Sequence, residues 1–326
     1  MGCLKTLFRG FCRSYAMARV QLVFAVAGNL NVDQYLLVER IPGPDEAVEV
    51  LDTFSEPGGA ATNVAVALAR LGAGVRLLGF VGLDDAGSFL LHRLSSLPLD
   101  LRGVRRVEKP TGRVFVVLDR SGRRAMLALR GANAELKPGS FEPGALEGVE
   151  HLHLSSTKPA FSEWMLAEAK KAGLTTSYDP GSAVASEGFT SLEAALRHVD
   201  VLLVNERELR MLGLENLKQE FRGLLVVKKG PLGSEAPFEG LSAPAFKVDV
   251  VDTTGAGDAF NAAFLVCWKL GMKLGDCLLL ANAAGALKAC RYGAQSSPTL
   301  EELLAFLSTR GLEELAARVR DAAQSK

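Results

Sequence analysis

Several features that mark specialised proteins are missing from this chain of 326 residues. Lysine plus arginine and aspartate plus glutamate both number 37, so the formal net charge is zero. A dedicated nucleic-acid binder needs a basic excess or a basic stripe, and the composition argues against one. No apolar run reaches the roughly 18 residues that a membrane-spanning helix needs. The balance of 48% hydrophobic and 23% charged residues instead predicts a folded globular protein.

The cysteines and histidines form none of the usual metal or redox patterns. The five cysteines contain no CxxC pair, and an odd number of them in a chain of this length indicates a reduced, cytoplasmic protein. The four histidines contain no HExxH motif. His151 and His153 alternate along one expected strand, where polar residues near a strand end explain them better than a metal-binding pair.

Three common ligand-binding loops are also absent. No Gly-Lys dipeptide occurs, so the chain has no Walker A loop. No GxSxG is present, which excludes the usual nucleophile elbow. No GxGxxG follows the first expected strand, which disfavours an ordinary dinucleotide-binding fold.

Apolar runs and helical segments alternate along most of the chain. The expected strands are 20–28, 75–81, 151–154, 175–178, 201–204, 224–228 and 246–251. The expected helices are 60–71, 86–94, 162–172, 191–198, 206–212, 257–270, 274–291 and 300–307. Repeated strand–helix units predict a mostly parallel sheet with helices on both faces, which is a three-layer α/β/α core.

Two strand-like segments, near 31–57 and 111–133, interrupt this alternation and predict a small separate sheet. The second contains an expected hairpin, with strands 114–119 and 124–129. We expect a single domain over 19–320. Residues 1–18 hold three basic residues and no acid, and they form an N-terminal extension. A transit-like leader, a start site upstream of Met17 and an ordered extra segment all remain open for it.

The sequence DTTGAGDAF at 252–260 carries the strongest chemical signal. Gly255, Ala256 and Gly257 have little or no side chain, so their backbone N–H groups can approach a ligand closely. Placed at a helix N-terminus, such donors form an anion site suited to a phosphoryl group. Asp258 falls in the first turn, where it is placed to accept a proton from a substrate hydroxyl. The alternative is a glycine turn with a capping aspartate, but a whole Gly-Ala-Gly-Asp turn after a strand favours a functional site.

A second group of residues predicts a substrate pocket. Gly58 and Gly59 precede an expected helix and permit close backbone approach, and Asn63 lies in the first turn of that helix. Asn31 and Asp33 follow the first strand, where open α/β sheets bind ligands, and their side chains suit sugar-like hydroxyls. The alternative is glycine and Asx turn chemistry without a ligand.

Two further segments suit a nucleotide and its metal ion. Asn205 and Glu208 place oxygen ligands on one face of a helical turn, which suits a water-retaining Mg²⁺ site. The alternative is an N-cap followed by a surface glutamate. Lys229, Gly230 and Gly233 follow another strand and leave room for a nucleotide.

Taken together, these motifs resemble the ribokinase family of sugar and nucleoside kinases, also called the PfkB family. GGAATNVAVALARLG (58–72) is similar to the N-terminal signature of the family, and DTTGAGDAF (252–260) to its more specific C-terminal signature. The resemblance runs from about 20 to 310. Four shorter segments also resemble family segments: NERE (205–208), KKGPLG (228–233), RGANAEL (130–136) and RYGAQSSPT (291–299).

The resemblance implies a three-layer core with a small β-sheet lid, through which several members dimerise. It implies transfer of the γ-phosphoryl of ATP to a substrate hydroxyl, with Mg²⁺. By motif position, Asp258 resembles the catalytic base and the backbone of 255–257 the anion hole. The resemblance also implies substrate contacts at Asn31, Asp33, Gly58, Gly59 and Asn63. It implies nucleotide contacts at Asn205, Lys229, Gly230, Gly233, Asn282 and Ala286, with Asn205 and Glu208 as the motif for Mg²⁺ and phosphate. Asp252 and Thr254 resemble positions whose carbonyls bind a monovalent cation such as K⁺ in some members.

The acceptor is less well defined by the sequence. Ribokinases have lysine after the paired glycines and an acidic sugar contact near the third strand, whereas this chain has Ala60 and Ser155. The first signature is closer to fructokinases and 2-keto-3-deoxygluconate kinases, which favours a small sugar such as these or ribose. The alternatives are a nucleoside (adenosine, cytidine or inosine) and a phosphorylated sugar such as fructose 6-phosphate. A phosphorylated sugar needs cationic partners, for which Arg113, Arg130 and Lys158 are available, although solvated surface charges explain them better.

Overall fold

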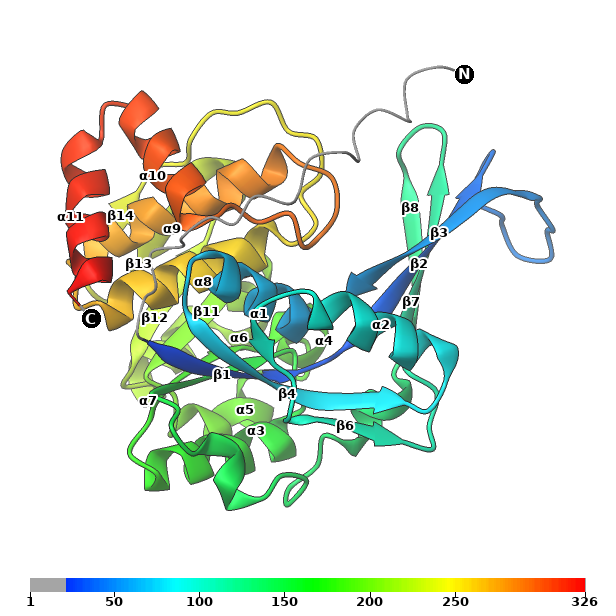
Figure 1. The fold of residues 1–326 in the computed structure, drawn as a ribbon, viewed down its shortest axis with the longest axis horizontal. Coiled ribbons are helices and arrows are strands. Elements are labelled where there is room, and N and C mark those ends of the chain that lie inside the picture. The colour runs from blue at the N-terminus through cyan, green and yellow to red at the C-terminus, as the bar shows by residue number, and fades with distance from the viewer. Residues whose placement is uncertain (1–21, 326) are drawn as a thin grey trace.

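The computed structural model describes residues 22–325, so the expected N-terminal extension lies outside the described residues. A ten-stranded sheet runs through the body of the molecule (Figure 1), in the order β14-β13-β12-β11-β10-β9-β1-β4-β5, with β6 paired to β4. All neighbours are parallel except the pairs made by β13. The strands are β1 (Val23–Gly28), β4 (Gly74–Gly82), β5 (Leu99–Asp100), β6 (Val104–Val107), β9 (His151–Ser155), β10 (Thr175–Asp179), β11 (Val201–Asn205), β12 (Leu224–Lys228), β13 (Ser234–Ala236) and β14 (Leu241–Ala243).

Helices cover both faces of this sheet, which confirms the expected three-layer core. The central strands are buried on both sides, and this is why they consist of almost continuous apolar runs. In β1, Phe24 and Val26 belong to the hydrophobic core on one face, and Ala25 and Ala27 to the core on the other. None of the described helices is long and apolar enough to span a bilayer.

The helices divide into two groups by the core to which they contribute. The first face carries α1 (Ala60–Arg70), α2 (Asp85–Ser95), α8 (Ala256–Lys269), α9 (Leu274–Ala289), α10 (Leu300–Thr309) and α11 (Glu313–Gln324). The second face carries α3 (Pro159–Lys171), α4 (Gly181–Ala185), α5 (Phe189–Leu196), α6 (Glu206–Leu212) and α7 (Leu214–Glu220). Three short 3₁₀ turns complete the chain: η1 (Gly131–Glu135), η2 (Pro143–Leu146) and η3 (Gly230–Leu232).

A separate four-stranded sheet projects from the body and forms the expected lid (Figure 1), in the order β3-β2-β7-β8. Its strands are β2 (Asn31–Val38), β3 (Val50–Gly58), β7 (Gly112–Asp119) and β8 (Arg124–Leu129). The β7–β8 pair is the predicted hairpin. The Asp119 carboxylate closes its turn by accepting hydrogen bonds from the backbone N–H groups of Ser121 and Arg123.

The pairing register decides which lid side chains face the body of the protein. Side chains alternate between the two faces of a strand. Asp33 and Tyr35 therefore share one face with Arg124, and Arg113 lies on the opposite face. The Arg124 guanidinium lies 3.4 Å from the Thr254 hydroxyl, so the face with Asp33 is the one directed at the body.

The expected strand over 246–251 is wrong. This segment has no regular secondary structure, and the antiparallel β13–β14 hairpin forms that edge of the sheet instead. Val250 and Val251 are exposed, and the N–H of Val251 donates to the Ala289 carbonyl at the end of α9. Their β-branched side chains gave the run its strand-like pattern without any sheet face to bury them.

Candidate functional site

The substrate side of the site forms where β1 ends and the first lid strand begins. A Cβ built on Gly58 would lie 2.3 Å from the Asp33 carboxylate, and one on Gly59 would lie 2.3 Å from the Asn29 carbonyl oxygen. Gly59 also has a φ of +93°, which glycine adopts readily and other residues rarely do. Only glycines at these two positions let the N-terminus of α1 pack against the chain at Asn29, Asn31 and Asp33.

Asn133 holds this turn in place. Its side chain accepts a hydrogen bond from the Leu30 N–H at 2.9 Å and donates to the Leu30 carbonyl at 3.2 Å. It also donates to Oδ1 of Asn31 at 2.8 Å. A Cβ on Gly112 would collide with both amides, so the base of β7 closes over the same contact. Asn133 lies in the RGANAEL segment, but nothing in its spacing from Asn31 revealed that it positions that residue.

The predicted anion hole lies at the N-terminus of α8. Gly255 is the N-cap, with a φ of +80°, and a Cβ there would lie 2.3 Å from the Ala294 carbonyl oxygen. The Ala256 N–H donates to the Thr253 carbonyl at 3.1 Å, which closes the turn. The following N–H groups of the first turn, beginning with Gly257, have no partner within a helix and carry its positive dipole end. The small residues at 255–257 leave the backbone accessible here, and the free donors begin with the Gly257 N–H.

Asp258 connects the two signature motifs. Nδ2 of Asn63 donates to Oδ2 of Asp258 at 2.9 Å, across 195 residues of sequence. The pKa of Asp258 is raised to about 6, mainly by burial and to a smaller extent by the Asp179 and Asp33 carboxylates, whereas Asn63 and Lys228 oppose the rise. Such a carboxylate is still mostly ionised at pH 7 but is a stronger base than a free aspartate.

A largely buried lysine, Lys228, lies close to the anion hole. Nζ of Lys228 is 2.6 Å from the Asp179 carboxylate and 3.1 Å from Oδ1 of Asn261. Nδ2 of Asn261 also donates to Asp179. The same ammonium lies 3.8 Å from the position of a Cβ on Gly257. Burial lowers the pKa of Lys228, but the Asp179 and Glu208 carboxylates outweigh it, so the pKa is raised and the group is cationic.

The sequence pattern did not indicate the roles of Lys228, Asp179 and Asn261. Lys228 and Lys229 are adjacent at the end of β12, and we expected Lys229 to contact the nucleotide. In the structure the Lys229 ammonium binds Glu235 at 3.0 Å, and Lys228 is the lysine directed at the anion hole. The alternation of side chains along a strand was the available signal, but without the sheet register it did not show which lysine points inward.

Asn205 and Glu208 form a complete capping box at the start of α6. Oδ1 of Asn205 accepts from the Glu208 N–H, and the Glu208 carboxylate accepts from the Asn205 N–H, both at 2.9 Å. Ser182 donates to the other Glu208 oxygen at 2.9 Å. Burial raises the pKa of Glu208, with a further rise from the nearby Asp179 carboxylate.

The carboxylates of Asp179 and Glu208 show whether an Mg²⁺ ion fits the site. Mg²⁺ usually keeps several waters and binds one or two carboxylates together with substrate phosphates. Asp179 and Glu208 interact electrostatically beside the anion hole and supply such carboxylates. Within the described residues no cluster of three or more histidine, cysteine or acidic side chains forms a closed metal cage. These residues fit an Mg²⁺ ion shared with phosphates, which Glu208 and Asp179 would hold on the protein side.

The remaining predicted nucleotide residues line one region between η3, β14 and α9. Gly233 has a φ of +98°, and a Cβ there would lie 2.1 Å from the Ala243 carbonyl. Nδ2 of Asn282 donates to the carbonyls of Ala243 and Pro244, both at 3.1 Å. Asn282 therefore fixes the backbone here, because its amide nitrogen is already committed.

Gly230 and Ala286 occupy open positions nearby. Gly230 begins η3 and has free space around its Cα. Ala286 is half-buried on α9, one residue after Gly285, at which a Cβ would approach the Ala256 carbonyl to 3.3 Å. The structure thus brings α9 close to the start of α8, where the anion hole lies.

The two histidines form a buried polar chain. His151 contacts the hydroxyls of Thr175 and Ser177, and His153 contacts those of Ser177 and Ser155, at 2.7–3.1 Å. Burial lowers the pKa of His153 to about 4 and that of His151 well below its usual range, so both rings are neutral. Both are hydrogen-bonded core residues, which agrees with the expectation that they are structural polar residues rather than a metal-binding pair.

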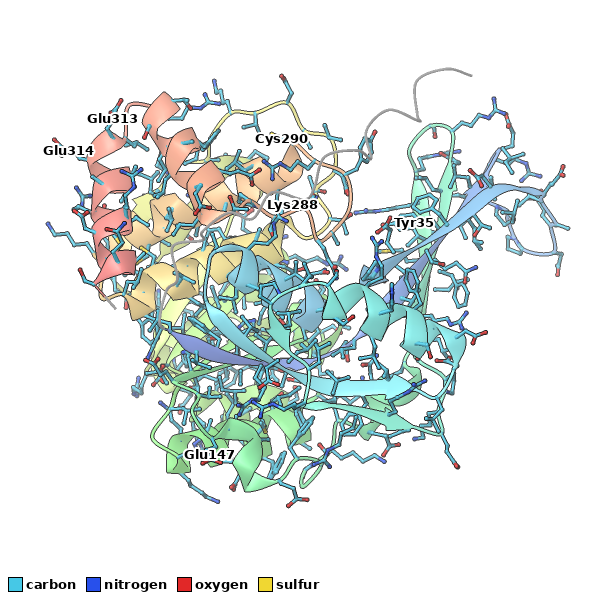
Figure 2. All side chains as sticks on the ribbon, viewed as in Figure 1. Tyr35, Glu147, Lys288, Cys290, Glu313 and Glu314 are labelled. Carbon is cyan, nitrogen blue, oxygen red and sulfur yellow. The ribbon has the colours of Figure 1, made fainter. Side chains whose placement is uncertain are left out.

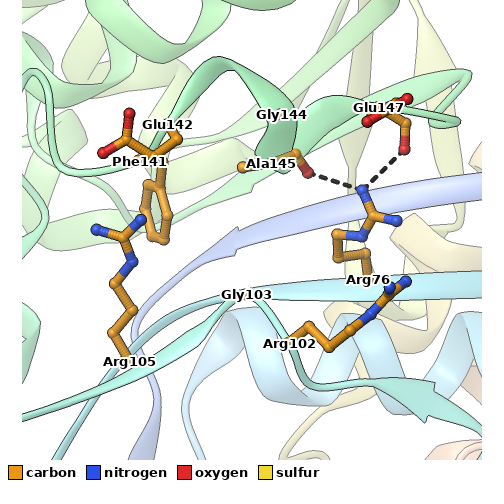
Figure 3. A pocket seen from close by; sticks show the side chains of 9 residues that line it. All are labelled: Arg76, Arg102, Gly103, Arg105, Phe141, Glu142, Gly144, Ala145 and Glu147. Atoms are coloured by element: carbon orange, nitrogen blue, oxygen red, sulfur yellow. Dashed lines mark hydrogen bonds between the residues drawn. The ribbon is translucent and has the colours of Figure 1, made fainter.

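A separate surface cavity of about 390 Å³ contains three arginines (Figure 3). Arg76 pairs with Asp100 at 2.9 Å and donates to the carbonyls of Ala145 and Glu147. Arg102 pairs with the same aspartate. None of the cavity's lining residues belongs to the site around Asp258. Because Arg76 and Arg102 already have anionic partners, we assign the cavity no ligand.

The fold and the site together define a kinase of small metabolites, and the comparisons agree. The family description "pfkB family carbohydrate kinase" matches residues 23–301. The chain belongs to this family, and it is a kinase.

Similar proteins cover nearly the whole chain. An ATP-dependent ribose-1-phosphate kinase of Halopiger xanaduensis is 38% identical over 293 residues, which is 87% of this chain and 97% of that protein. The ribokinase of Bacillus subtilis is 31% identical over 297 residues, with 87% and 98% covered. The crystal structure of the ribokinase from Thermotoga maritima has a TM-score of 0.78 at 32% identity and covers 88% of this chain and 99% of that one. A solved structure of a putative ribokinase II from E. coli, 23% identical to this chain, contains ATP and Mg²⁺.

Proposed function

We propose that this kinase transfers the γ-phosphoryl group of ATP to a hydroxyl of a small sugar, with Asp258 as the base. The observation that carries the proposal is the contact between Asn63 and Asp258 at the N-terminus of α8. This contact supports the proposal, because it joins an ionisable carboxylate near backbone donors suited to a phosphoryl group to the proposed substrate pocket.

The reaction follows from this arrangement. The acceptor hydroxyl gives its proton to Asp258, and its oxygen forms a bond to the γ-phosphorus. The bond between that phosphorus and the β,γ-bridging oxygen breaks, and ADP leaves with the electron pair. The first-turn N–H groups and the Lys228 ammonium face the charge on the transferred group, and phosphoryl transfer depends mainly on such positioning and neutralisation. Bound Mg²⁺ would add further neutralisation of the phosphate charge.

Three unpartnered polar atoms support a polyhydroxylated acceptor. Oδ1 of Asn29, Oδ1 of Asp33 and Oδ1 of Asn63 are buried and have no hydrogen-bond partner in the described structure. Buried polar atoms are normally satisfied, so these three acceptors are free for ligand donors. The hydroxyls of a sugar are donors of the kind that these three side chains lack. The lid contributes Asp33 to the pocket and excludes water while the acceptor is bound.

A phosphorylated sugar is the second candidate, favoured by the similarity to the ribose-1-phosphate kinase. Its phosphate needs a cation facing the pocket. Arg113 does not meet this need, because it lies on the far face of the lid and is 3.8 Å from Asp84. Lys158 is an exposed helix N-cap. Arg124, which the sequence did not single out, shares the lid face of Asp33, and Arg130 is half-buried near Glu187, so these two are the better candidates.

A coupled ADP-release assay with Mg-ATP tests both candidates. The acceptors are ribose, fructose, 2-keto-3-deoxygluconate, ribose 1-phosphate, fructose 6-phosphate, adenosine, cytidine and inosine. Turnover on a free sugar supports the first proposal. Preferential turnover on ribose 1-phosphate, weakened by Arg124→Met or Arg130→Met without loss of folding, supports the second. Preferential turnover on a nucleoside contradicts both assignments while leaving the kinase chemistry intact.

We also propose that two copies of the chain associate through the lid. Six of the twelve exposed large hydrophobic side chains in the described residues lie on the lid: Val50, Leu51, Phe54, Met126, Leu127 and Leu129. A small sheet with this much exposed apolar surface gains stability by covering it. Sedimentation should show a dimer for the wild type and a monomer for the double variant Met126→Asp, Leu127→Asp. A monomeric wild type at micromolar concentration would contradict the proposal.

A further inference from the structure

Two backbone segments meet beside the anion hole. One leads into α8 over 251–255, and the other leaves α9 over 289–294. The N–H groups of Val251 and Asp252 both donate to the Ala289 carbonyl, at 2.8 and 3.0 Å. The Asp252 carboxylate accepts from the N–H groups of Thr254 and Gly293, at 2.9 and 3.0 Å. The turn that ends at the anion hole is therefore attached to the end of α9.

The ammonium group of Lys288 lies between these segments. Figure 2 shows Lys288 close to the end of α9. Its Nζ donates to the Asp252 carbonyl at 2.8 Å and to the Arg291 carbonyl at 3.0 Å, and it lies 3.8 Å from the Asp252 carboxylate. The side chain is 0% exposed. Lysine is rarely fully buried unless it is paired, because burying an unpaired charge is very costly.

The surroundings of Lys288 are those of a monovalent cation site. Two main-chain carbonyls and a carboxylate oxygen face the ammonium, and rings of carbonyl oxygens are how proteins replace the water shell of K⁺. The C-terminal end of α9 adds its negative dipole end. Burial lowers the pKa of Lys288, and the Asp252 carboxylate opposes that change.

This contact decides how well an alkali ion fits the expected site. The sequence resemblance assigned a monovalent cation to the carbonyls of Asp252 and Thr254. In the structure the Asp252 carbonyl already accepts a hydrogen bond from Lys288. An alkali ion bound to the same oxygen would place a second positive charge against a buried ammonium. The residues present therefore do not fit K⁺ at this place.

We propose that the Lys288 ammonium is a built-in monovalent cation, which fixes the turn into the anion hole and removes the need for K⁺ there. Lys288 is thus a positioning residue, which acts through the backbone of Asp252 and Gly255. The inference rests on the proposed function, because the turn that it fixes carries the phosphoryl-binding donors. It also makes a separate statement about ion binding that does not depend on finding the acceptor.

The test compares wild type, Lys288→Met and Lys288→Gln in potassium chloride and in choline chloride of equal ionic strength. Kinase activity and melting temperature are both measured. Lys171→Met is the matched control, because Lys171 also lies in the last turn of a helix but is 73% exposed and pairs with Glu168 at the surface. It should behave as wild type in both salts.

The inference predicts that wild-type activity and melting temperature are the same in both salts. In choline the two Lys288 variants should lose activity by about ten- to hundredfold, as expected when a transition-state group is misplaced. Potassium should restore part of this activity and raise their melting temperature, because it fills the vacated carbonyl site. Wild-type activity that requires potassium would overturn the inference, and so would variants that are fully active in choline.

Two complications leave the test decisive. If neither variant folds, the salt dependence of the wild type alone decides, since potassium independence supports the inference and potassium dependence refutes it. If no acceptor is found, so that the proposed function fails, the melting temperatures still decide. Potassium must then stabilise the Lys288 variants and leave the wild type and Lys171→Met unchanged. A stabilisation of the wild type by potassium over choline would refute the inference.

Discussion

The pKa of Asp258, which burial raises and the hydrogen bond from Asn63 lowers, should set the acid limit of catalysis. Burial raises the pKa of Asp258 to about 6, and the base must be ionised to accept a proton. In the wild type, kcat/KM should therefore fall about tenfold for each pH unit below about 6. Asn63→Ala removes a donor 2.9 Å from the carboxylate. A hydrogen bond to a charged group contributes about 1.5–3 kcal/mol, which we reduce to about 1.4 kcal/mol because Asp258 is partly exposed to solvent.

At about 1.4 kcal/mol per pKa unit, the acid limb should move up by about one pH unit in Asn63→Ala. The sign is fixed, because loss of a donor destabilises only the ionised carboxylate. The assay is kcat/KM from pH 5 to 9, with Asn216→Ala, an exposed asparagine on α7, as the control. Asn63 also lies in the substrate pocket, so a lower rate alone proves nothing. A rate loss without movement of the limb would refute the reasoning.

Two further predictions concern the backbone at Gly255 and the buried carboxyl of Asp33. Gly255→Ala should lose about 1–3 kcal/mol of stability in urea unfolding, because φ is +80° and the new Cβ would lie 2.3 Å from the Ala294 carbonyl. Gly271→Ala, which has a similar φ but open surroundings, should lose less stability. An equal loss in the two variants would be inconsistent with the clash. Burial, with a smaller effect of Glu56, raises the pKa of Asp33 to about 6, so the native state holds that proton more tightly than the unfolded state and stability falls as pH rises from about 4 to 6. Asp33→Asn should therefore raise the free energy of unfolding by about 1–2 kcal/mol at pH 8 and leave it unchanged near pH 4. Equal effects at both pH values would show that ionisation of Asp33 is not the cause.

The parts of the fold that the sequence predicted well are those with two independent local signals. The strand 224–228 and the helix 206–212 combine an apolar pattern with a clear boundary, and both match the structure. The paired glycines at 58 and 59 were detected because glycine before a helix lets the backbone approach other groups closely. The 246–251 run had only an apolar pattern, and its valines are exposed rather than paired in a sheet.

The parts of the site that escaped prediction depend on contacts between distant segments. Lys288 is one more lysine near the end of a helix until the fold brings Asp252 against it, 36 residues away in sequence. Lys228 is indistinguishable from Lys229 until the sheet register directs one of them to the anion hole. Asn133 acts across 102 residues on Asn31. A buried polar side chain has no signature in its own neighbourhood, because its partners come from elsewhere in the chain.

Asp258→Asn provides the most direct test of the central claim, that a carboxylate at the N-terminus of α8 is the base of a phosphoryl transfer. The variant keeps the shape of the side chain and its place in the first turn. With the best acceptor, kcat should fall by about 10²–10⁴-fold, the range for loss of a general base. The affinity for a non-hydrolysable ATP analogue, measured by calorimetry, should change little. A variant that retains kcat within a few-fold of wild type, with the same nucleotide affinity, would contradict the assignment.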